Sequence, residues 1–385
     1  MYKLLIAICC MYCVVSCNEP QPGKNKNATS KNHTSTMQEG KDYIILKRIR
    51  SVDNQGFNQP VEVGSFLLPA NWQVTSGVVW NGRNKCIPEM VQASMNAKSP
   101  DGAYELIMLP VTQFDWSDDP VYLDAMQRGF NMHSCTIKKP SDAAGYIRQS
   151  MAPAMHATIK SAETITALQQ KMDEGAMQMT NAARQAGNSA YSHRGSAAEG
   201  TLSFTDGSEG IALCTLMQTI VTMPGTRGSM ANNYQCYVSM RVVVKYKTGN
   251  EQMARKILST FLGSARVNPL WQQAVQAMFV NIGRSAQIEI GKQIEITHQA
   301  QEEISNGIIR NWEKSSSNSG ENSTQQFSQY LRGVDSWTDE SGSKVELTSG
   351  YNNAWSRSDG SYLLTDNPAI DPNVTFNEGW KRLSK

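Results

Sequence analysis

A strict alternation of apolar and polar residues between positions 234 and 246 is the clearest pattern in the chain. The apolar positions are Tyr234, Cys236, Val238, Met240, Val242, Val244 and Tyr246. Polar side chains such as Gln235, Ser239 and Lys245 lie between them. Because successive side chains of a strand point to opposite faces, the pattern predicts one strand with one buried face and one mostly wet face.

Shorter apolar segments predict further strands on either side of a helical region. Strands are expected between about residues 41 and 115, and again between 201 and 247. The segment Ser99–Gly102, with the sequence Ser-Pro-Asp-Gly, predicts a hairpin turn because Pro fixes φ and Gly tolerates a positive φ. Apolar residues at helical spacing predict helices at about 120–132, 163–187 and 250–262.

This order of elements predicts an α+β fold, in which an antiparallel sheet carries helices on one face. We assign residues 41–265 to this sheet domain, with a helical insertion at about 120–200. The order of strands and helices resembles the small sandwich of the PsbP-like proteins, with a helical insertion after the first strands. The resemblance is one of element order alone and carries no diagnostic motif.

A long amphipathic pattern follows the sheet domain, at residues 266–315. Its apolar residues keep to one broad stripe that begins at Trp271 and Val275, which predicts one long helix or two helices in line. At 1.5 Å per residue, about 45 residues span roughly 70 Å, so the helix either packs across the sheet or projects and needs a partner. A segment rich in Ser, Asn and Gly at 315–325 then predicts a linker.

The last segment, residues 326–385, is rich in aromatic side chains and predicts a small β-meander. Its expected strands are Lys344–Thr348, Tyr351–Trp355 and Ser361–Leu364, with a turn at Asp359–Gly360. Clustered rings at strand ends can form a platform for sugar rings or a peptide. The candidate binding residues are Trp337, Tyr351, Trp355, Tyr362 and Trp380. The alternative is that a module with few aliphatic residues uses these rings as its own core.

The first 16 residues have the organisation of a secretory signal peptide. One positive charge at Lys3 precedes an apolar run over positions 4–15, which is too short to span a bilayer comfortably as a helix. The sequence Val-Val-Ser-Cys at Val14–Cys17 resembles the lipobox of bacterial lipoproteins. The resemblance implies cleavage before Cys17 and attachment of acyl chains, such as palmitate, to this residue.

The same resemblance implies an address in the cell envelope, with the protein anchored to a membrane on the periplasmic face or the cell surface. Residues 17–40 carry almost no apolar side chains after Cys17, which predicts a flexible tether between lipid and body. An ordinary signal peptide is the alternative, because Cys9, Cys10 and Cys13 show that cysteine is frequent here.

The charge balance excludes one class of partner. The 385 residues carry 36 Lys and Arg against 34 Asp and Glu, which gives a formal net charge of +2. This balance, without any Lys/Arg cluster, argues against a nucleic-acid-binding protein. Beyond the first segment no run reaches about 18 apolar residues, so no membrane-spanning helix is expected there.

Candidate chemistry is sparse. The body contains Cys86, Cys135, Cys214 and Cys236, which form either two disulfides of open pairing or free buried thiols. The five histidines are dispersed and no nucleotide, nucleophile or zinc motif occurs, so we assign no catalytic residue, metal or cofactor.

The sequence therefore predicts a membrane-anchored lipoprotein that acts as a non-enzymatic binding or assembly module, with an envelope protein or a glycan as partner. An envelope hydrolase that acts on glycan or peptide is the second hypothesis, because its carboxylates can come from distant loops. A purely structural lipoprotein without a ligand is the third.

Overall fold

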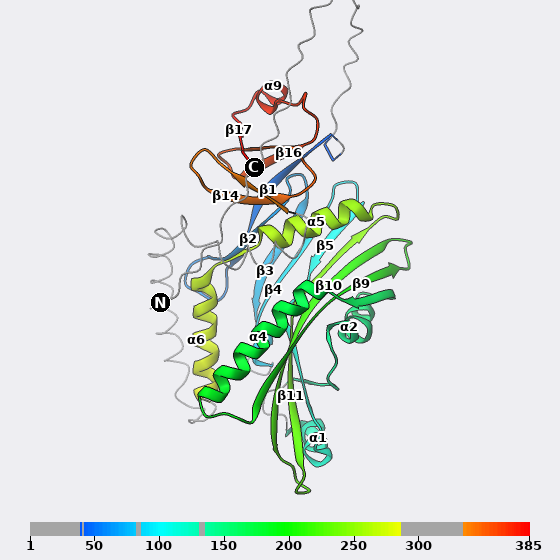
Figure 1. Ribbon diagram of the computed structural model, residues 1–385, viewed down its shortest axis with the longest axis vertical. Coiled ribbons are helices and arrows are strands. Elements are labelled where there is room, and N and C mark those ends of the chain that lie inside the picture. The colour runs from blue at the N-terminus through cyan, green and yellow to red at the C-terminus, as the bar shows by residue number, and fades with distance from the viewer. Residues whose placement is uncertain (1–38, 41, 82–85, 131–134, 286–333) are drawn as a thin grey trace, which may run out of the picture. The chain divides into compact units, whose positions relative to one another are not determined.

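The computed structural model describes residues 39–40, 42–81, 86–130, 135–285 and 334–385 (Figure 1). Within them, mostly antiparallel sheets combine with helices, which confirms the α+β class expected from the sequence. Two large sheets, named sheet A and sheet B here, carry most of the strands. The predicted signal peptide, Cys17 and nearly all of the predicted tether lie outside the described residues.

Sheet B contains the longest strands. They are β3 (Gln73–Trp80), β4 (Val91–Lys98), β5 (Tyr104–Met108), β6 (Thr112–Ser117), β7 (Thr136–Ile137), β8 (Ala157–Thr164), β9 (Tyr191–Phe204), β10 (Glu209–Pro224) and β11 (Met230–Tyr246). The order is β3-β4-β5-β11-β10-β9-β8, while β6 pairs with β11 as well and carries β7. The predicted hairpin at Ser99–Gly102 is confirmed, with Gly102 at a φ of 63° and the Asp101 carboxylate accepting the Ala103 amide.

A β-bulge divides β11 into two halves that bury opposite faces. The register with β10 shifts between Leu213 and Thr215, where β11 has one residue more than its partner. Within this bulge Met240 adopts a positive φ of 49°. The extra residue reverses the alternation, so that Val238 and Val242 pack into different cores. The prediction of one buried face along the whole strand is therefore wrong.

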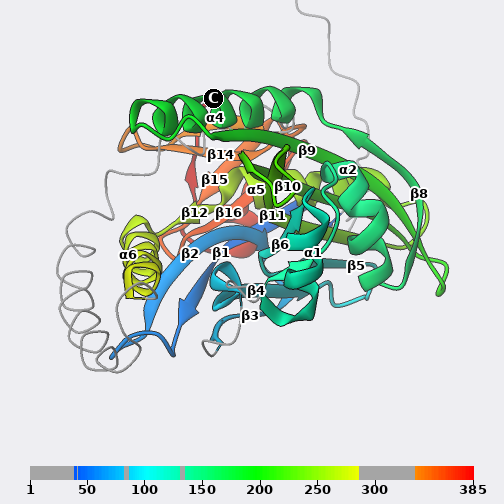
Figure 2. The ribbon, with the colours of Figure 1, turned by 90° about the horizontal axis from the view of Figure 1, so that it is seen from below.

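Helices cover both faces of sheet B, and not the single face that was predicted (Figure 2). The helices are η1 (Ile87–Glu89), α1 (Pro120–Ala125), η2 (Met126–Phe130), α2 (Ala143–Tyr146), η3 (Ile147–Met151), α3 (Ala152–Ala154), α4 (Thr166–Gln185) and α5 (Glu251–Ser264). On one face Ile147 and Met151 of η3 join a core with Leu202 and Leu216. On the other face Phe261 of α5 belongs to the core that the second half of β11 lines.

The helix predicted at 163–187 corresponds to α4, which packs along β9 on the same side of sheet B as α5 (Figure 1). The Gln169 side chain binds β9 by donating to the Gly195 carbonyl at 2.9 Å and accepting from the Ala197 amide at 3.1 Å. Gly195 permits this close approach, because a Cβ at that position would lie 2.5 Å from the carbonyl oxygen of Met172.

Sheet A joins the first described strands to the last. Its strands are β1 (Tyr43–Asp53), β2 (Val61–Pro69), β12 (Arg266–Val267), β15 (Asn353–Ser356), β16 (Ser361–Thr365) and β17 (Lys381–Arg382), in the order β12-β2-β1-β16-β15-β17. Because β16 pairs with β1, from Tyr43 opposite Thr365 onward, the aromatic C-terminal segment and the N-terminal strands share one sheet.

The predicted three-stranded meander forms only in part. The hairpin of β15 and β16 is present, but the preceding strand β14 (Lys344–Thr348) pairs with β13 (Val334–Thr338) in a separate two-stranded sheet. A short helix, α9 (Pro372–Phe376), lies between β16 and β17 in the chain. The predicted pairing of Lys344–Thr348 with the next strand is therefore wrong. This strand pairs instead with β13, which the sequence pattern did not indicate.

The described part of the predicted long helix is α6 (Pro269–Ser285). Its Trp271 and Val275 pack against Val63 of β2, Val78 of β3 and Val91 of β4. This part of the helix therefore packs on the sheets of its own chain. Residues 286–315 of the predicted helix and the predicted linker lie outside the described residues.

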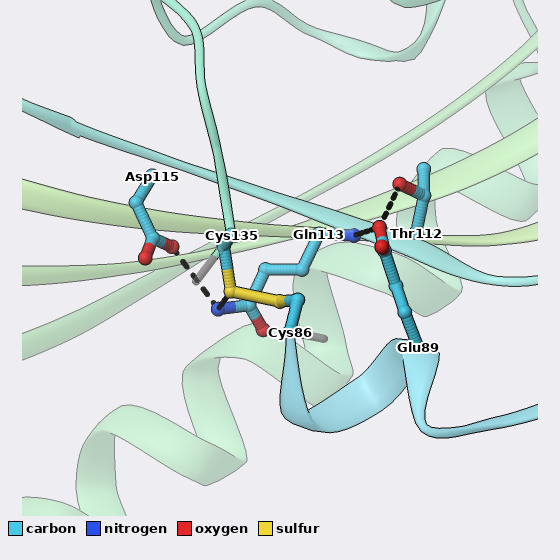
Figure 3. The surroundings of a disulfide bond; sticks show 6 residues. All are labelled: Cys86, Glu89, Thr112, Gln113, Asp115 and Cys135. Atoms are coloured by element: carbon cyan, nitrogen blue, oxygen red, sulfur yellow. Dashed lines mark hydrogen bonds between the residues drawn. A yellow bond between two sulfur atoms is a disulfide. The ribbon is translucent and has the colours of Figure 1, made fainter. Parts of the chain in front are cut away.

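A disulfide joins Cys86, which precedes η1, to Cys135, which precedes β7 (Figure 3). Gln113 of β6 lies beside the bond and donates to the Cys135 sulfur at 3.4 Å and to the Asp115 carboxylate at 3.0 Å. The Glu89 carboxylate accepts from the backbone N–H of Gln113 at 3.3 Å. Cross-linking positions 49 residues apart stabilises the fold by about 4 kcal/mol, because it limits the unfolded chain.

The fully buried carboxylate of Asp53 ties the end of β1 to β3 and α6. One oxygen accepts the indole N–H groups of Trp80 and Trp271, at 2.9 Å and 3.0 Å. The other oxygen accepts the backbone amides of Gln55 and Gly56, both at 2.9 Å. Four donors from three segments of the chain thus converge on one side chain.

We predict that Asp53→Asn lowers the free energy of unfolding by about 2–3 kcal/mol, because the new amide presents N–H groups where the carboxylate accepts. Urea unfolding followed by circular dichroism measures the change. Asp173→Asn, on an exposed position of α4, is the control and should differ from the native protein by less than about 0.5 kcal/mol. Equal stability of the two variants would contradict the role assigned to Asp53.

Candidate functional site

The five aromatic residues selected from the sequence lie in the core beside sheet A and do not form an open platform. Trp337, Tyr351, Trp355 and Trp380 are buried, with exposed fractions of 9% or less. Tyr362 is partly buried against the hydrophobic cluster that contains Trp337 and Tyr351. The structure thus corresponds to the alternative left open by the sequence, in which these rings serve as core.

A cation of the same chain stands over four of these rings. The distances from the cationic group to the ring centroid are 5.0 Å for Lys385 and Trp337, 4.6 Å for Lys256 and Tyr351, 4.9 Å for Arg357 and Trp380, and 6.0 Å for Arg382 and Trp355. A ligand that stacked on these rings would have to displace these side chains, which argues against a binding platform here.

Cys214 and Cys236 are free and buried. They do not face each other, because Cys236 pairs with Gln218 across β10 and β11. Burial raises the pKa of each thiol to about 12, so both stay protonated near neutral pH and are poor nucleophiles. Neither residue fits a catalytic role.

A polar cleft opens on sheet B, on the face that α2 and η3 cover further along the strands. Two rows of paired residues cross β9, β10, β11 and β6 here, namely Arg194–Gln218–Cys236–Phe114 and Ser192–Ile220–Tyr234–Trp116. Four of these side chains line the cleft: Arg194, Gln218, Tyr234 and Trp116. The cleft has a volume of about 410 Å³, which lies within the range of small-molecule sites.

The segment Lys139–Asp142 forms a wall of the cleft and is bound to the strands beneath it. Gln218 donates from Nε2 to the Ser141 carbonyl at 2.9 Å. At the start of α2, the Ala143 amide donates to the Ser196 hydroxyl at 2.9 Å. These hydrogen bonds fix the wall to the strands of the protein itself, which reduces the ordering cost of binding.

The two carboxylates of the cleft already accept hydrogen bonds. The Asp118 carboxylate accepts from the Tyr234 hydroxyl at 3.0 Å and from the side-chain amide of Asn232 at 3.4 Å. Burial, together with the hydrogen bond to Asp118, raises the pKa of Tyr234, so its hydroxyl remains a donor. Asp142 caps α2 by accepting the Gly145 amide at 2.6 Å.

The two basic side chains of the cleft are less engaged. Lys139 and Arg194 are exposed, and no ion pair joins either one to a carboxylate within the described residues. Ser141 contributes a hydroxyl that is buried without a hydrogen-bond partner among those residues. The cleft thus combines available donors with two carboxylate acceptors, and its formal charges balance.

Asp119, beside the cleft residue Asp118, fastens α1 to the turn between β10 and β11. Its carboxylate accepts the Thr226 amide at 2.5 Å and the Thr226 hydroxyl at 2.8 Å, and it also caps α1 at Val121. These hydrogen bonds, led by that from the Thr226 amide, lower the pKa of Asp119 from 3.8 to about 2. No local sequence pattern indicates the contact with Thr226, which lies 107 positions further along the chain.

Sequence reasoning missed the residues of this cleft. Trp116 lies in a short strand without a long alternating pattern, and Arg194 lies within the predicted helical insertion at about 120–200. Only Tyr234 was singled out, and then as a buried strand position. No local signal marks the others, because the pairing of β6, β9, β10 and β11 is what brings them together.

Comparison of the chain with family models, with curated proteins and with solved structures found no match. Among the described residues, no group of three or more His, Cys, Asp or Glu side chains is arranged to hold a metal ion. No helix in that part of the chain is both long enough and apolar enough to cross a membrane.

We predict that Trp337→Ala lowers the free energy of unfolding by about 3–5 kcal/mol, because it empties a large volume in a packed core. Urea unfolding measures the loss. Val374→Ala, at a side chain that is 82% exposed, should change stability by less than about 0.5 kcal/mol. A tolerated Trp337→Ala would instead indicate a surface role for this ring.

We predict that the stabilisation by Asp119 depends on pH. The pKa of Asp119 is lower in the folded state, so its contribution is complete above about pH 4 and falls as the pH drops toward 2. The difference in urea midpoint between the native protein and Asp119→Asn should therefore shrink between pH 4 and pH 2. Asp124→Asn, at an exposed helix pair, should show no comparable trend, and a difference that stayed constant with pH would refute the assignment.

Proposed function

We propose that the chain is a lipoprotein of the cell envelope, anchored to a membrane through acylated Cys17, and that it acts as a non-enzymatic binding module. The observation that carries the binding role is the preformed cleft of sheet B, in which Trp116, Gln218 and Arg194 line a floor and Lys139–Asp142 form a wall. The C-terminal aromatic residues serve as core in this proposal.

The disulfide supports an address outside the reducing cytoplasm. A Cys86–Cys135 bond persists in oxidising compartments, such as a periplasm or a cell surface, and is uncommon in the cytosol. The lipobox-like sequence Val14–Cys17 and the apolar run before it support the same address. A protein that is anchored to the membrane and has an open cleft could bind another component of the envelope there.

A hydrolase is the second candidate, because the cleft holds two carboxylates, Asp118 and Asp142. In glycoside hydrolysis one of the two must act as a protonated acid, and enzymes favour that state by placing the carboxyl in an apolar pocket. Asp118 and Asp142 are both exposed and both accept hydrogen bonds. These surroundings favour binding over acid catalysis.

Capture from native membranes tests the proposal. The intact lipoprotein would be incubated with a detergent-solubilised envelope fraction, and retained proteins and glycans would be identified by mass spectrometry. We expect a specific component that the native protein retains and that Trp116→Ala and Gln218→Ala lose at least about tenfold. The same sample should show an acylated N-terminal Cys17.

Tyr122→Ala is the matched control, because Tyr122 is an exposed aromatic residue that does not line the cleft. It should retain the component as the native protein does. Equal retention by the cleft variants and the native protein would contradict the role of the cleft. Shortened glycans in the eluate, formed only when Asp118 is intact, would favour the hydrolase instead.

A further inference from the structure

We propose that the cleft of sheet B recognises a neutral glycan, a chain of uncharged, hydroxyl-rich sugar rings. This inference rests on the proposed binding function and specifies its ligand. Three properties of the cleft carry it: an aromatic side chain that is open to the ligand, donors and acceptors placed side by side, and formal charges that cancel.

Trp116 supplies the aromatic surface. Its indole lines the cleft and is partly exposed, and it pairs across the strands with Tyr234, which adds a second ring to the floor. No stacked ring or overlying cation accompanies Trp116 within the described residues, in contrast to the C-terminal tryptophans. A large, rigid and amphipathic ring of this kind can pack against the C–H face of a sugar.

The polar groups around Trp116 match hydroxyl chemistry. A hydroxyl both donates and accepts, so a sugar can donate to the carboxylates of Asp118 and Asp142 while it accepts from Arg194 and Lys139. A ligand with only donors or only acceptors would leave half of these groups unpaired, at a cost in affinity.

The charge balance argues against an ionic ligand. An anion that approaches Arg194 also meets Asp118 and Asp142, and a cation that approaches those carboxylates meets Arg194 and Lys139. Opposite charges along one cleft therefore select against net charge on the ligand. A zwitterionic peptide would be compatible with these charges and is therefore the competing ligand that the test includes.

Binding to defined probes tests this inference. The intact protein would be titrated by calorimetry, and by tryptophan fluorescence, with a glucose hexasaccharide, an N-acetylglucosamine hexasaccharide, a hexasaccharide that contains glucuronic acid, and a zwitterionic pentapeptide. We expect at least one neutral hexasaccharide to bind. Trp116→Ala should weaken it about tenfold or more, and Trp116→Phe, which keeps a ring, should weaken it about threefold. Tyr122→Ala should bind as the native protein does.

The outcomes separate this inference from the proposed function. Trp116-dependent binding of the acidic hexasaccharide or the pentapeptide alone would overturn the neutral-glycan assignment and leave the cleft as a binding site. Capture of an envelope component that depends on the cleft, without binding of any hexasaccharide, would also overturn the neutral-glycan assignment and leave the cleft as a binding site. Failure of both capture and titration would overturn the function and the inference together. Neutral-glycan binding that Trp116→Ala leaves unchanged would place the sugar site elsewhere.

Discussion

The β-bulge in β11 is the constraint on which the architecture of sheet B depends. One additional residue at Met240 turns the side chains of the second half of the strand to the face opposite those of the first half. Cys236 and Val238 therefore pack under α2 and η3, whereas Val242 and Val244 pack under α5. Two cores on opposite faces of one sheet result from a single strand.

The bulge also marks the point where β11 changes its partner. The first half pairs with β6 and the second half with β5, and the Leu109 amide between these two strands donates to the Arg241 carbonyl at 2.7 Å. With the first half facing α2, Tyr234 and its neighbour Trp116 stand on the face where the cleft opens. Along β10 this face changes from apolar to polar. Leu216 lies in the core under the helices, and Gln218, two residues further along, lines the cleft.

Sheet A depends on contacts between segments that lie far apart in the chain. Pairing of β1 with β16 brings the aromatic C-terminal segment against Leu46 and Leu67, where Trp337 is almost completely buried. The Asp53 carboxylate fixes the opposite end of β1 through two indole groups. Aromatic side chains therefore stabilise this fold in two ways, by packing in the core and by donating hydrogen bonds. Trp116 differs from them because it lines an open cleft.

The sequence by itself determined the local elements: the α+β class, the Ser99–Gly102 turn, the helix α4 and the strand character of residues 234–246. These features follow from interactions between residues near one another in the chain, such as side-chain alternation and turn propensity. Only the tertiary structure decided that β11 carries a bulge, that β13 pairs with β14, and that Trp116, Arg194 and Gln218 meet in one cleft. Strand pairing is non-local, and one extra residue reverses every following side chain, so the alternation of apolar positions could not reveal these features.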